Sequence, residues 1–143
     1  MGIGTVLESI FRQLDALGRD VSARRRTGLE TQALQARLGA LGLSCPDDLA
    51  SIYAFSDGVS AEPGETIGKI TLFPGYYWVA LAEALEIYGA VSTDARWSSS
   101  WLPIFASGGG DFYAVICDSK SPDFGGWSVS SLARPSGLWN SSR

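Results

Sequence analysis

The sequence contains no histidine in its 143 residues. This absence excludes His–Cys zinc sites, Ser–His–Asp and Cys–His catalysis, haem ligation by histidine and a histidine-based pH switch. The two cysteines, Cys45 and Cys117, are too few for a disulfide framework and have no histidine to activate a thiol. We therefore expect two reduced thiols, no metal and no cofactor.

Long apolar runs are also missing, since no stretch approaches the roughly 20 residues that a membrane helix needs. Charged residues interrupt residues 1–20, so this segment lacks the apolar core of a signal peptide. Met1-Gly2 resembles a myristoylation start, but Val6 stands where that pattern needs Ser or Thr. We expect a cytoplasmic protein with no membrane partner.

Basic residues are few: 11 Lys and Arg face 15 Asp and Glu, for a net charge of −4. Residues 1–40 hold six basic and four acidic groups (+2), and residues 41–143 hold five and eleven (−6). A nucleic-acid surface needs clustered cations, so none is expected; the acidic later part favours a basic protein partner. Arg24-Arg25-Arg26 is the one possible basic patch, but the favoured interpretation is the C-terminal end of a helix, where cations suit the dipole.

The first part of the chain has helical periodicity, with apolar residues three and four positions apart. Thr27 with Glu30 fits a capping box at a helix start, and Asp57-Gly58 fits a helix end. The pattern predicts three helices, over residues 5–26, residues 29–40 and from Pro46 to Gly58.

After Gly58 the period changes to the alternation of strands. Gly108-Gly109-Gly110 between two apolar strands indicates an antiparallel hairpin, and Pro103 removes a donor, so its strand should pair on one side only near that point. The expected elements are strands at 67–72, 76–79, 101–106, 112–118 and 127–130, and a helix at 81–88.

This order of elements predicts an α+β fold, in which N-terminal helices are packed on one face of a twisted, mainly antiparallel sheet. The length fits a single domain of residues 1–143. Within it, residues 1–58 are mostly helical, residues 59–130 form the sheet with one inserted helix, and residues 131–143 are an irregular tail.

Acidic and aromatic residues of the later part are the candidates for partner binding, although a solvated acidic face and an aromatic core are the alternatives. Trp97, next to Arg96 and three serines, is the expected exposed anchor, whereas Trp78 also suits the core. Asp111 follows the glycine turn and either accepts local hydrogen bonds or faces a partner. The candidates are Asp57, Glu62, Glu65, Trp78, Glu83, Asp94, Trp97, Asp111 and Asp118.

Catalysis would have to use carboxylates or a thiol. Asp111 and Asp118 lie near opposite ends of one predicted strand, about 20 Å apart, which is too far for one acid–base site. No reaction site can be assembled from the sequence, so we expect a protein that is not an enzyme.

Three segments carry motifs in an order that fits one known family: Leu38-Gly39 followed by Cys45–Tyr53 and Ser56-Asp57-Gly58; Leu81–Tyr88; and Trp101–Phe105 followed by Gly109–Val115 and Asp118. They resemble the "LP-x-D-L … Y … N-G" stretch, the "L-x-E-A … Y" helix and the "W-x-P-I … G-G-D-x-Y … D" hairpin of the SUKH superfamily, the Smi/Knr-type proteins. The resemblance covers residues 29–118. It departs from the family at Cys45, where Leu is usual, at Asp57, where Asn is common, and after Trp127, where a further strand and a C-terminal helix are usual.

The resemblance implies binding rather than chemistry. Bacterial members of the family are immunity proteins that bind and inhibit a cognate toxin, often a nuclease. This chain would thus bind a basic toxin domain through an acidic and aromatic surface. A regulatory or scaffold module without a toxin partner is the alternative, because fungal relatives resemble regulatory interaction proteins.

Overall fold

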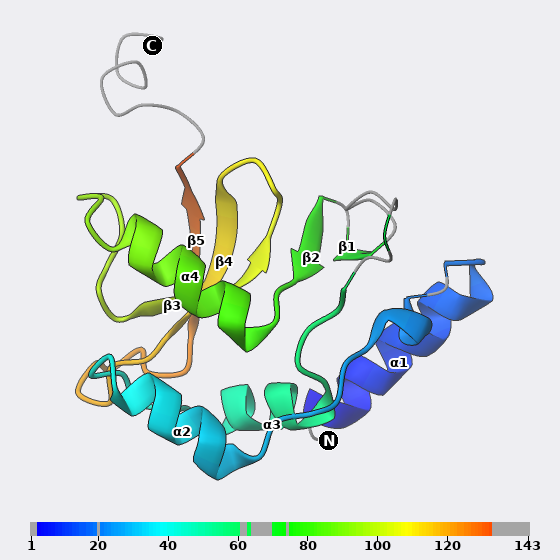
Figure 1. The fold of residues 1–143 in the computed structure, drawn as a ribbon, viewed down its shortest axis with the longest axis horizontal. Coiled ribbons are helices and arrows are strands. Elements are labelled where there is room, and N and C mark those ends of the chain that lie inside the picture. The colour runs from blue at the N-terminus through cyan, green and yellow to red at the C-terminus, as the bar shows by residue number, and fades with distance from the viewer. Residues whose placement is uncertain (1–2, 20, 61–62, 64–69, 74, 133–143) are drawn as a thin grey trace, which may run out of the picture.

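The computed structural model describes residues 3–19, 21–60, 63, 70–73 and 75–132. It confirms the α+β class, with four α-helices and an antiparallel sheet of five strands (Figure 1). No helix of the described ranges has both the length and the apolar character that a membrane span requires. The elements are α1 (Ile3–Ala16), η1 (Ser22–Arg24), α2 (Thr31–Gly39), α3 (Asp47–Phe55), β1 (Thr71–Phe73), β2 (Tyr76–Trp78), α4 (Leu81–Val91), β3 (Trp101–Ala106), β4 (Asp111–Ile116) and β5 (Trp127–Ser131).

The five strands form a meander in the order β1-β2-β3-β4-β5, each antiparallel to the next. Pro103 pairs with Ala114 of β4, whereas the β2 partners of β3 are only Phe105 and Ala106. The one-sided pairing expected at Pro103 is therefore confirmed. The register shifts just after Pro103, because a residue without an N–H suits a bulge better than a regular ladder.

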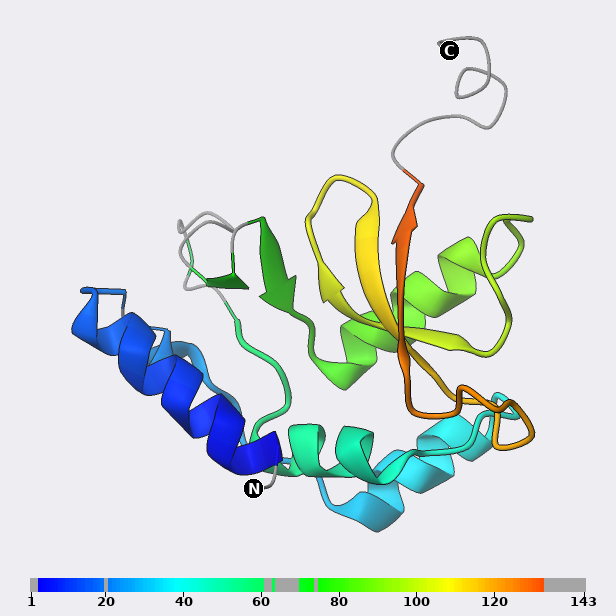
Figure 2. The ribbon, with the colours of Figure 1, turned by 180° about the vertical axis from the view of Figure 1, so that it is seen from behind.

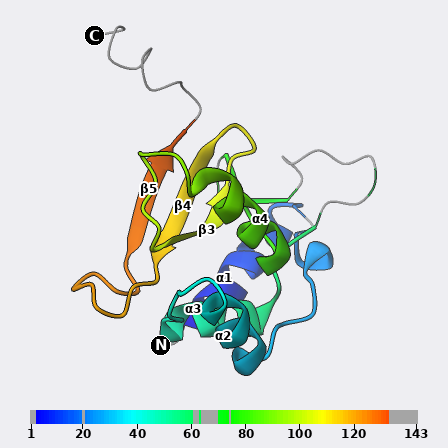
Figure 3. The same cartoon turned by 60° about the vertical axis from the view of Figure 1, so that its left-hand side comes forward.

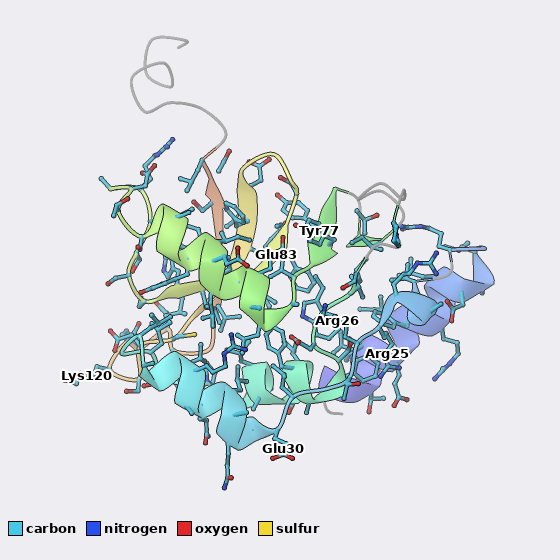
Figure 4. All side chains as sticks on the ribbon, viewed as in Figure 1. Arg25, Arg26, Glu30, Tyr77, Glu83 and Lys120 are labelled. Atoms are coloured by element: carbon cyan, nitrogen blue, oxygen red, sulfur yellow. The ribbon has the colours of Figure 1, made fainter. Side chains whose placement is uncertain are left out.

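Adjacent residues of β2 show which element covers each face of the sheet, since neighbouring side chains of a strand point to opposite sides. Tyr77 donates a hydrogen bond from its hydroxyl to Glu83 of α4 (2.5 Å), so α4 lies over this face (Figures 1 and 4). Trp78 packs on the other face against Phe11 of α1 and Phe55 of α3, with ring centroids 6.4 Å away in both cases. The N-terminal helices therefore contact the face opposite to α4.

The N-terminal helices cover only part of that face. Seen from behind, α1 lies beside the β1–β2 end of the sheet, while β4 and β5 stand in front with α4 behind them (Figure 2). The view in Figure 3 shows α2 and α3 below the strands rather than across them. None of the described N-terminal helices lies across the β4–β5 end of this face in these views.

The first helix is shorter than its apolar periodicity predicts. It ends at Ala16 instead of residue 26, and Gly18 then takes a φ of 81°, which turns the chain back. This turn places Val21 in the core. Arg24 ends the short η1 and Arg25 pairs with Val59 as an isolated bridge, so the three arginines do not end the long helix that the sequence predicts.

Two other helix predictions differ in detail from the structure. The capping box expected from Thr27 and Glu30 is wrong, because α2 begins at Thr31 and the Glu30 side chain makes no capping bond. The predicted start of α3 at Pro46 is one residue early, since Pro46 is the N-cap position. The strand expected at residues 67–72 lies mostly outside the described residues, which show β1 at Thr71–Phe73.

A backbone corner from Ser56 to Gly58 joins the helical layer to the sheet. The buried Ser56 hydroxyl accepts a bond from the N–H of Arg26 (2.9 Å) and lies 2.8 Å from the carbonyl of Gly58. Gly58 has a φ of 71°, and a Cβ added to it would lie 2.4 Å from the backbone nitrogen of Ala80. Only glycine therefore fits between α3 and the chain that enters α4.

Replacing Gly58 should test how tight this corner is. We expect Gly58→Ala to destabilise the protein by several kcal/mol, because the new Cβ overlaps backbone that cannot move away cheaply. Gly75→Ala is the matched control: its φ is 87°, but nothing lies within 4 Å, so only the cost of about 1–2 kcal/mol for a left-handed residue should appear. Urea unfolding measures both, and equal losses would contradict the close approach.

The Trp78 ring should be the largest single contribution of the sheet to the core. Trp78→Ala should lower the free energy of unfolding by about 3–5 kcal/mol, because the ring is fully buried among three aromatic neighbours. Trp127→Ala, at a position where the side chain is half exposed, should cost about 1 kcal/mol or less. Urea unfolding midpoints, compared at an unchanged dependence of the unfolding free energy on urea, measure the difference. A smaller loss of unfolding free energy for Trp78→Ala than for Trp127→Ala would refute this packing.

Candidate functional site

The described residues contain no group of three or more His, Cys, Asp or Glu side chains that could hold a metal ion. An open cleft of about 750 Å³ lies between the α4–β3 loop and the β4–β5 loop. Four serines line it, together with Trp101, Phe124 and Trp127, and Asp123 is the one ionisable side chain of this lining. A lone carboxylate among serines makes no acid–base pair in this cleft.

The two thiols are free and poorly suited to nucleophilic chemistry. Burial, reinforced by the nearby Cys45, raises the pKa of the Cys117 thiol to about 12. Partial burial and the charge of Asp47 also raise the pKa of Cys45. Because the thiolate is the reactive form, both groups are held in the inert state near neutral pH.

Both predicted tryptophans lie in the core. Trp78 is fully buried, and Trp97 is 5% exposed, so the expectation that Trp97 is an exposed anchor is wrong. The chain after α4 turns the Trp97 ring inward, where it meets Trp101 and Phe112 edge-on at 5.5 and 5.8 Å. Its indole N–H donates to the carbonyl of Trp101 (3.1 Å), which satisfies the polar atom inside the core.

Two of the predicted acids, Asp57 and Glu83, bind groups of other elements within the protein. Asp57 accepts a bond from the N–H of Leu81 (2.8 Å) at the first turn of α4, where the helix dipole favours a carboxylate. The same carboxylate lies 3.9 Å from Arg26, and Glu83 accepts the bond from Tyr77 described above (Figure 4). Burial, with Glu83 as the second cause, raises the pKa of the Tyr77 hydroxyl. These acids therefore hold the fold, whether or not a partner also touches them.

Asp94 pairs with Arg96 two residues later, through oxygen–nitrogen contacts of 2.8 and 3.0 Å. The side-chain bonds from Arg96, followed by its backbone N–H, lower the pKa of Asp94 to about 2. This pair fixes the loop between α4 and β3. It also neutralises one of the acidic groups that the sequence analysis assigned to a partner.

The remaining predicted acids lie at different places. Asp118 is exposed after the end of β4 and accepts a bond from the N–H of Lys120 (2.9 Å). Asp111 is half-buried at the start of β4. Glu62 and Glu65 lie outside the described residues. The structure thus brings the seven candidates that it describes to no common surface.

A different set of residues shares one face of the sheet, opposite to α4. We call it the aromatic face and define it by Tyr76, Phe105, Tyr113, Trp127 and Val129. The Tyr76 and Tyr113 rings meet at 4.8 Å, and Phe105 and Trp127 meet at 5.8 Å. Val129 stands directly opposite Tyr113 in the register, so these contacts join β2, β3, β4 and β5 into one surface.

The outer strand has an inverted burial pattern. Trp127 is 47% exposed and Val129 is 62% exposed, whereas Ser130 of the same strand is only 8% exposed. A strand that serves the core alone places its apolar residues inward and its serines outward. Large apolar side chains exposed together are a mark of an interaction surface.

An apolar groove of about 290 Å³ extends the aromatic face toward α1. Phe105 belongs to both surfaces, and Leu17, which is 76% exposed, lies at the end of the groove. The α1 residues that line the groove are Leu7, Ile10, Gln13 and Leu14, and Leu72 of β1 also lines it.

The charge of the sheet is one-sided. The five strands contain no lysine or arginine, and Asp111 is their one charged residue. Asp111 belongs to the aromatic face, because it alternates with Phe112, whose ring contacts Trp97 on the α4 side. Partial burial raises the pKa of the Tyr76 hydroxyl, and the Asp111 carboxylate adds to the shift.

Of the aromatic face, the sequence analysis identified Asp111 alone. The alternation Trp127-Ser128-Val129-Ser130 correctly predicted a strand, but alternation does not show which side is buried. One sequence signal could have pointed to this face. In Trp127-Ser128-Val129-Ser130 the residues that alternate with the large apolar side chains are serines, which are too small to fill a core well.

The chain matches no family model, and no curated protein matches it either. The resemblance to the SUKH superfamily therefore rests on the motifs alone.

The buried thiol should make stability depend on alkaline pH. The folded state holds the Cys117 proton more tightly than the unfolded chain, so unfolding releases a proton above pH 9 and stability falls as the pH rises. We expect a loss on the order of 1–2 kcal/mol between pH 8 and pH 10 from this thiol. Urea unfolding at several pH values measures it: Cys117→Ala should flatten the slope and Cys45→Ala should largely keep it. An unchanged slope in Cys117→Ala would contradict this assignment.

Proposed function

We propose that the protein is a non-catalytic binding protein of the immunity type, which binds a bacterial toxin domain in the cytoplasm and blocks it sterically. The observation that carries the proposal is the inverted outer strand, which exposes Trp127 and Val129 beside three further aromatic residues. A core does not need this arrangement, whereas a protein partner would bury it.

Two further features support the proposal. The SUKH-like motifs span residues 29–118, and the bacterial branch of that family has immunity function. The excess of acidic residues after residue 40 suits a basic partner, because opposite potentials speed the encounter and set its specificity.

Co-expression with the toxin domain encoded by a neighbouring gene tests this function. We expect the protein to restore growth to cells that express the toxin domain and to elute with that domain from a size-exclusion column. An unrelated toxin domain is the control and should be neither bound nor neutralised. Lack of both rescue and complex would end the proposal, and a complex without rescue would favour the regulatory alternative.

A further inference from the structure

We propose that the aromatic face binds a protein surface that presents arginine side chains, which stack on Tyr76 and Tyr113 and pair with Asp111. This inference rests on the proposed binding function and names the site and the chemistry of the partner. It is argued from the apolar exposure of β5, from the charge of the sheet and from a contact of the same kind inside the protein.

The apolar part of the site is set by the two outward residues of β5. Trp127 and Val129 are the most exposed large apolar residues of the sheet, at 47% and 62%. Phe105 continues this surface into the groove beside α1, so one partner surface could cover both. Burial of an exposed tryptophan is the commonest source of binding energy at the centre of protein interfaces.

The negative charge of the site favours a cationic group of the partner. No lysine or arginine stands on any of the five strands, and Asp111 stands two residues before Tyr113 on the same face of β4. The Tyr113 ring in turn meets the Tyr76 ring. A guanidinium group can stack on an aromatic ring and donate two hydrogen bonds to a carboxylate at the same time, whereas an ammonium group is a smaller and more strongly hydrated charge. The combination of ring and carboxylate therefore favours arginine over lysine.

The protein uses this contact within its own fold. The Arg25 guanidinium lies 3.8 Å from the centre of the Phe55 ring and donates a hydrogen bond to the Phe55 carbonyl (2.8 Å). At the aromatic face, the Asp111 carboxylate would take the place of this carbonyl as the acceptor. A carboxylate acceptor makes the hydrogen bond stronger than a neutral carbonyl does.

The first test uses a defined probe and the full chain. A blocked Gly-Arg-Gly-Arg-Gly peptide is titrated into ¹⁵N-labelled protein, with Gly-Glu-Gly-Glu-Gly as the matched control peptide. The arginine peptide should shift the indole N–H signal of Trp127, assigned by its absence in Trp127→Phe, and the glutamate peptide should not. Equal shifts with both peptides, or no shift with the arginine peptide, would overturn the proposal.

Two substitutions at one exposed position separate charge from apolar contact. Val129→Lys and Val129→Glu remove the same side chain and add opposite charges directly opposite Tyr113. We expect Val129→Lys to bind the arginine peptide about three- to fivefold more weakly than Val129→Glu does. Asp111→Asn should lower the affinity for this peptide by a similar factor. Glu86→Gln changes an exposed acid of α4 on the other face and should leave the affinity unchanged. Equal affinities for the two Val129 variants would refute the charge argument.

The same variants in the co-expression assay keep this inference separate from the proposed function. If the wild-type protein restores growth and Val129→Lys does not, the aromatic face is supported; the thermal midpoint of Val129→Lys, expected near that of Val129→Glu, shows that the variant folds. If both Val129 variants restore growth as the wild type does, this inference fails and the proposed function stands. Sedimentation tests a second copy as occupant: self-association of the wild type that Val129→Lys abolishes would overturn the proposal.

Discussion

The burial of Trp78 fixes the sides of the whole sheet. Its ring enters the space between α1 and α3, and the next residue back, Tyr77, therefore points to α4. Residues that stand opposite each other in an antiparallel ladder point to the same face, so this orientation extends to the next strand. Phe105, opposite Trp78, faces the side of the N-terminal helices, and Ala106, opposite Tyr77, faces α4. The exposure of Trp127 and Val129 at the far end is a consequence of which way one tryptophan points.

The helical layer is held to that tryptophan by the corner at Ser56–Gly58. The Ser56 hydroxyl accepts a bond from the N–H of Arg26, in the chain after η1, and the Asp57 carboxylate accepts one from the N–H of Leu81 at the start of α4. Because Gly58 has no Cβ, the backbone of Ala80 can approach it closely. The buried Tyr53 hydroxyl adds a bond to the carbonyl of Val79 (2.9 Å). These are mostly backbone and short side-chain contacts, so they fix an orientation more than they add apolar burial.

The sequence predicted the parts of the fold that depend on local patterns. The hairpin of β3 and β4 and the strand β5 were found because glycine turns and apolar alternation are local signals. The end of the first helix was placed ten residues too late, because periodicity continues through Gly18 while the chain does not. The site was largely missed for a related reason: alternation defines two faces, and only the packing of Trp78 decides which of them is covered.

The predicted acids show why composition alone misplaces a binding surface. Counted as charges, Asp57, Glu83 and Asp94 belong to an acidic face, yet each is satisfied by a donor of its own fold. Charge spread in this way acts at long range, where it speeds the approach of a basic partner. Affinity needs side chains that lose little freedom on binding. Aromatic rings held on a paired sheet meet this condition, because few rotatable bonds remain to be ordered and the backbone beneath them is fixed by the ladder. In the proposed complex, the acids would supply the long-range attraction and the aromatic face the short-range contact, so different residues would serve the two tasks.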